Sequence, residues 1–259
     1  MHVAPVDLRA FRQEGIVIRF SMLGSMAYVL AEIPADGTGE TMLERPCTDP
    51  HWGFVVKGEL IFRTDGERET IPAGRAFHVP PGGPLHRFEV PAGAILAGFA
   101  PVEPDADVSD DRLAAQGFEP VEMRPAATIL PPVAQRRVPS RRIQAESWPM
   151  SQFQLTRVRM GERSGYTSSW CDVPHWGVVT SGRLAIEWED DVELLSTGDV
   201  FHCPAGPPGH RIEAADPATF IDLTPVEALA SGARIAEWRR DPDAAPSPRS
   251  GKIAVASLG

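Results

Sequence analysis

The sequence predicts an all-β protein made of two similar domains in tandem. Two observations carry this prediction. The 259-residue chain repeats itself at a constant offset of 124 residues, without a gap over residues 47–89 and 171–213. Short apolar runs separated by glycine and proline turns recur in both halves, which is typical of a β-sandwich or barrel. The period is too long for a solenoid, whose units span roughly 20–50 residues, so it indicates a duplicated domain.

The first half opens with residues 7–13, which could form a short helix before Gly15. Strand-like runs follow from Ile16 onward, with alternating or continuous apolar character. The longest covers residues 52–63 and is broken at Gly58. Thr64-Asp-Gly then supplies a hairpin turn. In the second half residues 152–160 form the matching kind of strand, and a polar Glu-Asp-Asp replaces the turn.

The predicted domains are residues 1–103, a linker over 104–139, residues 140–227, and a C-terminal helix and loose tail over 228–259. The linker contains one short helix, with Ser109 as N-cap and Gly117 as its stop. A second helix is expected over residues 225–240, where apolar side chains recur at helical spacing. The tail after Asp241 is rich in proline, alanine and serine.

Composition excludes several classes of protein. The formal net charge of −10 argues against a nucleic-acid binder, which normally presents a basic face. No apolar run approaches the roughly 18–20 residues that span a bilayer, so no membrane partner is expected. The N-terminal residues lack a signal-peptide pattern, which predicts a cytoplasmic protein. Three cysteines without a framework fit a reducing compartment, where thiols bind metal or pack in a core.

Six of the seven histidines fall into two matched sets, which are His51, His78 and His86 and, 124 residues later, His175, His202 and His210. Cys47 and Cys171 keep the same offset. A solvated histidine has no reason to be held in register through a duplication, so the pattern indicates a metal site in each half. The third cysteine, Cys203, is matched by Val79 and is predicted to belong to the core.

Two motifs in each half resemble those of the cupin superfamily. The first is Pro50-His-Trp-Gly-Phe-Val-Val-Lys-Gly-Glu-Leu, repeated as Pro174-His-Trp-Gly-Val-Val-Thr-Ser-Gly-Arg-Leu. The second is Gly74-Arg-Ala-Phe-His-Val-Pro-Pro-Gly, repeated as Gly198-Asp-Val-Phe-His-Cys-Pro-Ala-Gly. The resemblance implies a bicupin, that is, two tandem jelly-roll β-barrel domains with a few short helices and a site at the centre of each. The motif Cys-x-x-Pro-His-Trp-Gly is most similar to small bacterial cupins.

The departures from the family pattern define the candidate ligands. His51 and His175 stand where most metal-binding cupins carry glutamate, and the usual upstream His-x-His pair is missing. One spacing of the family motif puts a ligand at position 47, which is cysteine. The implied ligands are Cys47, His51 and His86 with His78 as a possible fourth, and Cys171, His175 and His210 with His202 as the corresponding one.

Geometry limits how these ligands can meet. Four residues of straight strand span roughly 13 Å, so the chain must bend between Cys47 and His51, where Pro50 permits it. Gly53, which lies on the same face as His51, predicts a cavity wall with room for a ligand. Thiolate and imidazole favour zinc as the divalent cofactor, with iron, nickel or copper as alternatives. Three ligands would leave an open, catalytic position, whereas four would close the site.

Each candidate also has a purely structural interpretation. The histidines could be hydrogen-bonded core residues inherited by both halves, and His78 and His202 could replace a packing aromatic ring. Arg87 and Arg211 could hold a carboxylate of a substrate, or pair on the surface with Glu89 and Glu213.

The sequence thus leaves two functions open. The first is a metal-dependent enzyme of dioxygenase, isomerase or lyase type that acts on a small organic acid. The second is a non-enzymatic cupin of sensor or storage type, because the fold hosts both. Both halves keep the same candidate ligands, so neither half is favoured and neither site is expected to have decayed. A homodimer is expected, since cupin barrels commonly pair.

Overall fold

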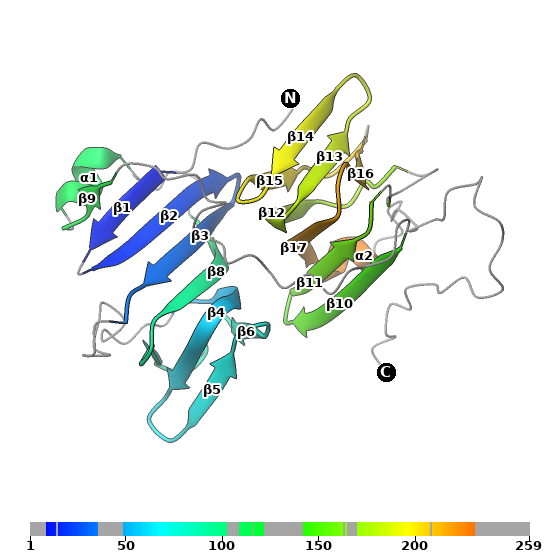
Figure 1. The fold of residues 1–259 in the computed structure, drawn as a ribbon. Coiled ribbons are helices and arrows are strands. Elements are labelled where there is room, and N and C mark those ends of the chain that lie inside the picture. Colours follow the sequence, from blue (N-terminus) through cyan, green and yellow to red (C-terminus); the bar gives the residue numbers. More distant parts are fainter. Residues whose placement is uncertain are drawn as a thin grey trace. The chain divides into compact units, whose positions relative to one another are not determined.

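The computed structural model describes residues 9–13, 15–35, 49–102, 109–115, 117–121, 142–162, 164, 170–207 and 209–230. The chain divides into two compact units (Figure 1), which are residues 6–131 and residues 132–259 together with residues 1–5. Strands dominate both units, as the sequence predicts. Among the described residues, no helix has the length and apolar character that crossing a bilayer requires.

The N-terminal unit is one nine-stranded antiparallel sheet in the order β5-β4-β8-β3-β2-β1-β9, with β6 and β7 also paired to β4. Its strands are β1 (Arg9–Gln13), β2 (Ile16–Leu23), β3 (Met26–Ile33), β4 (His51–Arg63), β5 (Arg68–Pro72), β6 (Ala76–Val79), β7 (Arg87–Glu89), β8 (Ala94–Pro101) and β9 (Glu119–Pro120). Helix α1 (Asp110–Ala115) lies between β8 and β9.

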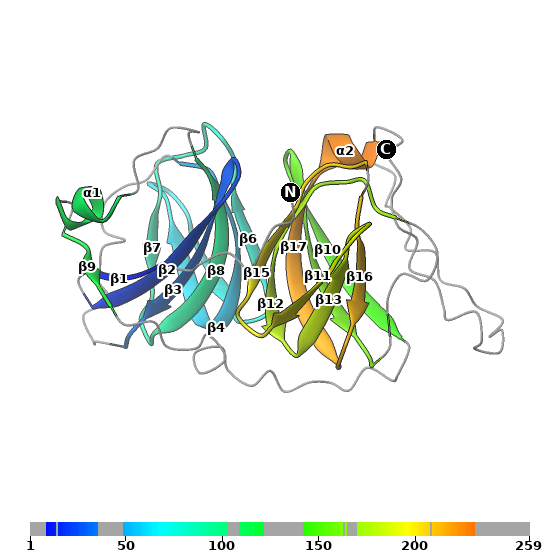
Figure 2. The ribbon, with the colours of Figure 1, turned by 90° about the horizontal axis from the view of Figure 1, so that it is seen from above.

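The C-terminal unit contains a five-stranded sheet in the order β10-β11-β17-β12-β15 (Figure 2) and a three-stranded sheet in the order β14-β13-β16 (Figure 1). Its elements are β10 (Ile143–Met150), β11 (Phe153–Met160), β12 (His175–Ser181), β13 (Arg183–Glu187), β14 (Val192–Ser196), β15 (Val200–Cys203), β16 (Arg211–Ala214), β17 (Ala218–Pro225) and α2 (Val226–Ala230). One hydrophobic core takes side chains from both sheets, among them Val158, Phe201, Leu184 and Ile212. Cys203 belongs to this core, as predicted.

The strands that carry the histidines are paired identically in the two units. Trp52 lies opposite His78, and Trp176 lies opposite His202. β4 is the counterpart of β12 and β13 together, and its register shifts just before Gly58. Gly58 has φ +78°, and a Cβ there would meet the carbonyl oxygen of Gly93 at 2.2 Å. Strand β4 runs through Gly58 without the predicted break, and Gly58 occupies a left-handed position that leaves no room for a side chain.

The turn and helix signals of the sequence are largely confirmed. The Asp65-Gly66 turn joins β4 to β5, since Arg63 pairs with Arg68 across it. The Ser109 hydroxyl accepts a hydrogen bond from Arg112 at the start of α1. Gly117, with φ +84°, follows the end of α1. The predicted second helix begins as α2, and its expected continuation to residue 240 lies outside the described residues.

The helix predicted for residues 7–13 is wrong, because its described part is strand β1. Phe11 is buried and stacks on Phe20 of β2 with ring centroids 5.6 Å apart. Arg9 also lies over both rings. Five residues are too few for an independently stable helix, whereas pairing with β2 satisfies their backbone and buries the ring.

The space predicted beside Gly53 is also wrong. A Cβ at Gly53 would lie 2.2 Å from the ring of Phe77, and one at Gly177 would lie 2.1 Å from the ring of Phe201. The glycine recurs in both halves because a phenylalanine of the neighbouring strand covers it. These positions are close-packed core, where added atoms are not tolerated without strain.

Candidate metal centre

One group of three metal-capable side chains stands out in the described part of the chain. Cys171, His175 and His210 place one donor atom each within 4.8 Å of one another. Cys171 and His210 are buried, and the side chain of His175 is only 12% exposed. A thiol and two imidazoles are soft and borderline donors that transition metals prefer. The structure therefore brings together three residues that the sequence predicts as metal ligands.

The local fold brings these donors together in spite of their separation along the chain. His175 begins β12, and Cys171 lies before it in a short bridge with His210. Backbone hydrogen bonds of 2.8 and 3.0 Å join Cys171 and His210 in both directions. The chain thus bends between residues 171 and 175, as expected from the spacing, and the Cys171 Sγ comes within 3.3 Å of the His175 Nε2.

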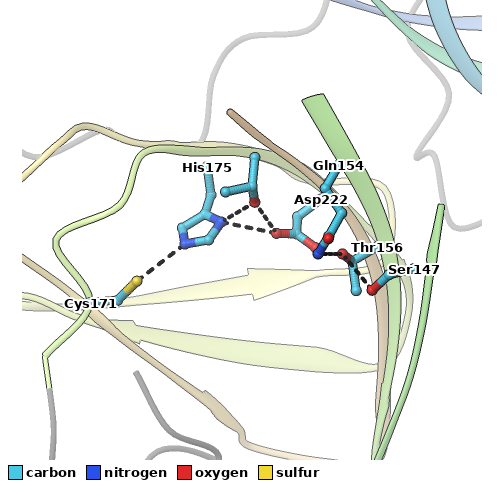
Figure 3. Close-up of polar contacts among 7 residues, drawn as sticks. Ser147, Gln154, Thr156, Cys171, His175 and Asp222 are labelled. Atoms are coloured by element: carbon cyan, nitrogen blue, oxygen red, sulfur yellow. Dashed lines mark hydrogen bonds and ion pairs between the residues drawn. The ribbon is translucent and has the colours of Figure 1, made fainter. Parts of the chain in front are cut away.

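A carboxylate and a hydroxyl fix the orientation of His175 (Figure 3). The His175 Nδ1 donates to the Asp222 Oδ2 at 2.9 Å and to the Thr224 Oγ1 at 2.8 Å. The Thr224 hydroxyl in turn donates to the same carboxylate oxygen, at 3.1 Å. Because Nδ1 is bonded to Asp222 and Thr224, Nε2, which faces Cys171, is the nitrogen of His175 that a metal could bind. Metal-ligating histidines almost always have such a partner on their other nitrogen.

The charges around His175 match this arrangement. Burial by itself would lower the pKa of His175, but its bonds to Asp222 and Cys171 raise it to about 10. In the metal-free protein the imidazolium thus neutralises negative charge in the cluster. A cation at the same place would replace the imidazolium proton, which is how metal binding releases protons.

His210 is buried without polar compensation. It is fully shielded from solvent, and neither of its ring nitrogens has a hydrogen-bond partner among the described residues. Burial and the nearby His175 hold its pKa well below the usual value. An unpartnered buried imidazole costs free energy in the folded protein. A metal ion would supply the missing partner, so the residues present fit a metal.

The N-terminal unit holds the corresponding histidine pair in a different environment. The rings of His51 and His86 are 5.4 Å apart and nearly perpendicular, as are those of His175 and His210 at 5.2 Å. Phe62 stacks on His86 at 5.3 Å, and Phe88 contacts both imidazoles. Cys47 lies outside the described residues.

Burial, and to a lesser degree the neighbouring His86, lowers the pKa of His51 to about 4, against the opposing effect of Asp49. Between about pH 6.5 and 4, His51 is therefore protonated in the unfolded chain but neutral in the folded protein. Stability contributed in this way is present above pH 6.5 and is lost as the pH falls through this window.

We expect the free energy of unfolding of the metal-free protein to fall between pH 7 and 4.5 more steeply for wild type than for His51→Gln. The difference should reach at most about 3 kcal/mol. Urea unfolding at the two pH values measures it. Equal losses in both proteins would show that His51 is not shielded from protonation.

The remaining predicted ligands, His78 and His202, lie opposite Trp52 and Trp176 on the neighbouring strands, and so on the other face of the sheet from His51 and His175. His202 stacks on Trp176 with ring centroids 5.2 Å apart and an interplanar angle of 5°. His78 stacks on Trp52 in the same way, at 5.8 Å and 21°. His202 is not in the three-residue group, so the structure brings together the three-ligand set rather than the four-ligand one.

The arginines predicted to anchor a substrate are not among the cluster residues. Arg211 is bonded to Glu187 of the adjacent strand rather than to Glu213, and lies 4.8 Å over the ring of Trp170. Arg87 is exposed, and Glu89 pairs with Arg63. Use of Arg211 to hold a carboxylate would require breaking its present pair, so this role stays a prediction.

Asp222 and Thr224 are the residues that sequence reasoning missed. They lie in the strand Ala218–Pro225, whose other members are mostly apolar and buried. Two polar residues two apart in such a strand share one face. That signal was available, but nothing in the sequence said that this strand lies beside His175.

No family model matches the sequence, and no curated protein matches it. Solved structures do match the fold. AerE from Microcystis aeruginosa aligns over 86% of this chain and 98% of its own, with 11% identity and a TM-score of 0.58. Oxalate decarboxylase from Bacillus subtilis, in a study of its Mn(II) centres, aligns over 87% and 77%, with 14% identity and a TM-score of 0.62. A structure of that enzyme at pH 4.6 aligns over 85% and 74%, with 12% identity and a TM-score of 0.58.

At these identities the comparison bears on the fold. The predicted all-β jelly-roll fold is confirmed, whereas membership of the cupin superfamily, inferred from the glycine, proline and histidine motifs, stays a prediction. The bicupin assignment and the ligand roles stay predictions. The chain has the jelly-roll fold of the cupins.

Proposed function

We propose that this chain is a metal-binding bicupin whose C-terminal unit holds a zinc-type ion on Cys171, His175 and His210. One observation carries the proposal, namely that three donors converge in a buried place, with the Nε2 of His175 lying 3.3 Å from the Sγ of Cys171. The Mn(II) centres of the oxalate decarboxylase neighbour support metal binding as a use of this fold. A thiolate donor favours zinc over manganese here.

We further propose that the centre is catalytic. Three protein ligands leave the fourth position of a tetrahedral ion to water or substrate, which is the arrangement of catalytic rather than structural zinc. When bound, the metal supplies Lewis acidity. The chain's own residues would hold and orient it, since Asp222 and Thr224 fix His175 and Cys171 packs beside the buried Val173. A small organic acid is the substrate class to screen first, because one fold neighbour is named for oxalate.

Cobalt substitution tests both statements. Wild-type protein loaded with Co(II) should show a thiolate-to-metal charge-transfer band, and azide should change its visible spectrum. Cys171→Ser should lose the band, whereas Cys203→Ala should keep it, because Cys203 is a core residue of the same unit. A spectrum without the band would remove Cys171 from the ligand set. Indifference to azide would indicate a closed centre, and the non-enzymatic binding protein would then be the better account.

A further inference from the structure

The two halves share their histidine pairs but not the residues that support them. On β17, Asp222 lies opposite Gly177, two residues after His175. On β8 of the N-terminal unit, Gly98 lies opposite Gly53, two residues after His51. The repeat likewise matches Thr224 with Ala100. The carboxylate and the hydroxyl that bind His175 therefore have no side-chain counterpart at the matched positions.

The difference extends to the next strand of each sheet. In the C-terminal unit Thr156 and Gln154 of β11 lie opposite Asp222 and Thr224. In the N-terminal unit Val29 and Ala27 of β3 lie opposite Gly98 and Ala100. Gln154 donates to the Thr156 hydroxyl at 3.3 Å, and the latter is 3.2 Å from the Ser147 hydroxyl. The C-terminal unit thus has a strip of hydrogen-bonding side chains on β17 and β11, and the matched positions of the N-terminal unit carry glycine and apolar residues.

We infer that Asp222 and Thr224 are positioning residues for His175, and that their absence from the first half confines the metal to the C-terminal unit. This inference rests on the proposed metal centre. It replaces the expectation that neither half had lost its site, because equal ligands do not make equal sites when the groups that orient them differ.

Asp222 and Thr224 can affect metal binding because they bind one ring nitrogen of His175, Nδ1, and leave the other, Nε2, for the metal. Accepting the Nδ1 proton leaves the Nε2 lone pair for the metal and increases its basicity. The Asp222 carboxylate also offsets the charge of the ion, and its Oδ1 has no hydrogen-bond partner among the described residues. Thr224 holds the carboxylate by donating to Oδ2, so the rotation of the imidazole is fixed from two sides. Loss of such a partner typically costs 10–100-fold in metal affinity.

Zinc affinity, measured by competition with a chromogenic chelator, tests the inference. Asp222→Ala should weaken binding roughly 10–100-fold, Asp222→Asn should fall between it and wild type, and Thr224→Val should weaken binding by a smaller factor. Thr156→Val removes a hydroxyl of the same strip that does not touch His175, and should leave the affinity unchanged. Circular dichroism and the urea midpoint of each metal-loaded variant establish that it is folded.

A second readout separates positioning from a merely structural role. In the Co(II) protein the Nδ1 proton of His175 should give a shifted NMR resonance that exchanges slowly with water. In Asp222→Asn, which keeps an acceptor oxygen, the resonance should persist with faster exchange, and the resonances of the other ligands should stay in place.

The outcomes distinguish this inference from the proposed centre on which it rests. A folded Asp222→Ala protein with wild-type affinity would overturn the positioning role while leaving the metal centre intact. Wild type that binds about two equivalents per chain would overturn confinement to one unit. Wild type that binds no zinc would overturn the centre itself.

Discussion

Metal content is expected to fall from about one equivalent per chain to background in His175→Ala, and to stay unchanged in His51→Ala. The expectation follows from the unequal surroundings of the two matched histidines. His175 has Asp222 and Thr224 on its Nδ1 and Cys171 beside its Nε2. His51 contacts the ring of Phe88, with glycine and alanine where the second half has the two polar residues. Loss of one of three ligands removes most of the affinity of such a site.

Elemental analysis of tag-free protein, after loading with zinc and gel filtration, measures the effect. The two alanine variants form a matched pair, since each removes the same imidazole from the start of a corresponding strand. Circular dichroism shows whether both are folded, and His210→Ala provides a second loss of a ligand from the same cluster. Metal content that falls by half in each of the two variants would show two equivalent sites and would contradict the asymmetry.

The metal-free protein is expected to become more stable when His210 is replaced by leucine, although the same change removes metal binding. His210 is fully buried, and its two ring nitrogens have no hydrogen-bond partner among the described residues. Leaving a buried polar group unsatisfied costs about 1–3 kcal/mol. Leucine has a similar volume and can contact Trp188, whose ring centroid is 5.8 Å from that of His210. Free energies of unfolding in the presence of a chelator measure the gain.

His86→Leu is the control for this experiment. His86 is also buried, but its Nδ1 is bonded to the carbonyl oxygen of Pro84 at 3.0 Å. The leucine there loses a hydrogen bond along with the unsatisfied Nε2, so its gain should be smaller. A His210→Leu protein less stable than wild type in chelator would show that His210 has a packing or polar role that outweighs its unsatisfied nitrogens. A buried group that costs stability and binds a ligand is typical of a functional site.

Much of the fold was readable from the sequence because local signals and the repeat agreed. The Asp-Gly turn and the capped helix at Ser109 each depend on a few neighbouring residues. Residues 9–13 show the limit of such signals. These residues form a strand because they pair with β2. The five residues alone do not predict that pairing.

The candidate site was predictable in its ligands and not in its surroundings. Cys171, His175 and His210 were recognisable because they recur at a fixed offset. Asp222 does not recur, so a search for matched residues passes over it, although its position is what distinguishes the halves. The glycine at 177 recurs for a reason of packing, since the ring of Phe201 covers it. Repetition thus reports what both halves share, whereas the inferred difference in metal binding rests on residues that they do not share.

X-ray absorption at the zinc edge of the loaded protein tests the central claim most directly. The account predicts one sulfur at about 2.3 Å, two imidazole nitrogens at about 2.0 Å and one further light atom. Loss of the sulfur contribution in Cys171→Ser, with the nitrogens kept, would complete the assignment. A first shell made only of nitrogen and oxygen in wild type would contradict a centre formed by Cys171, His175 and His210.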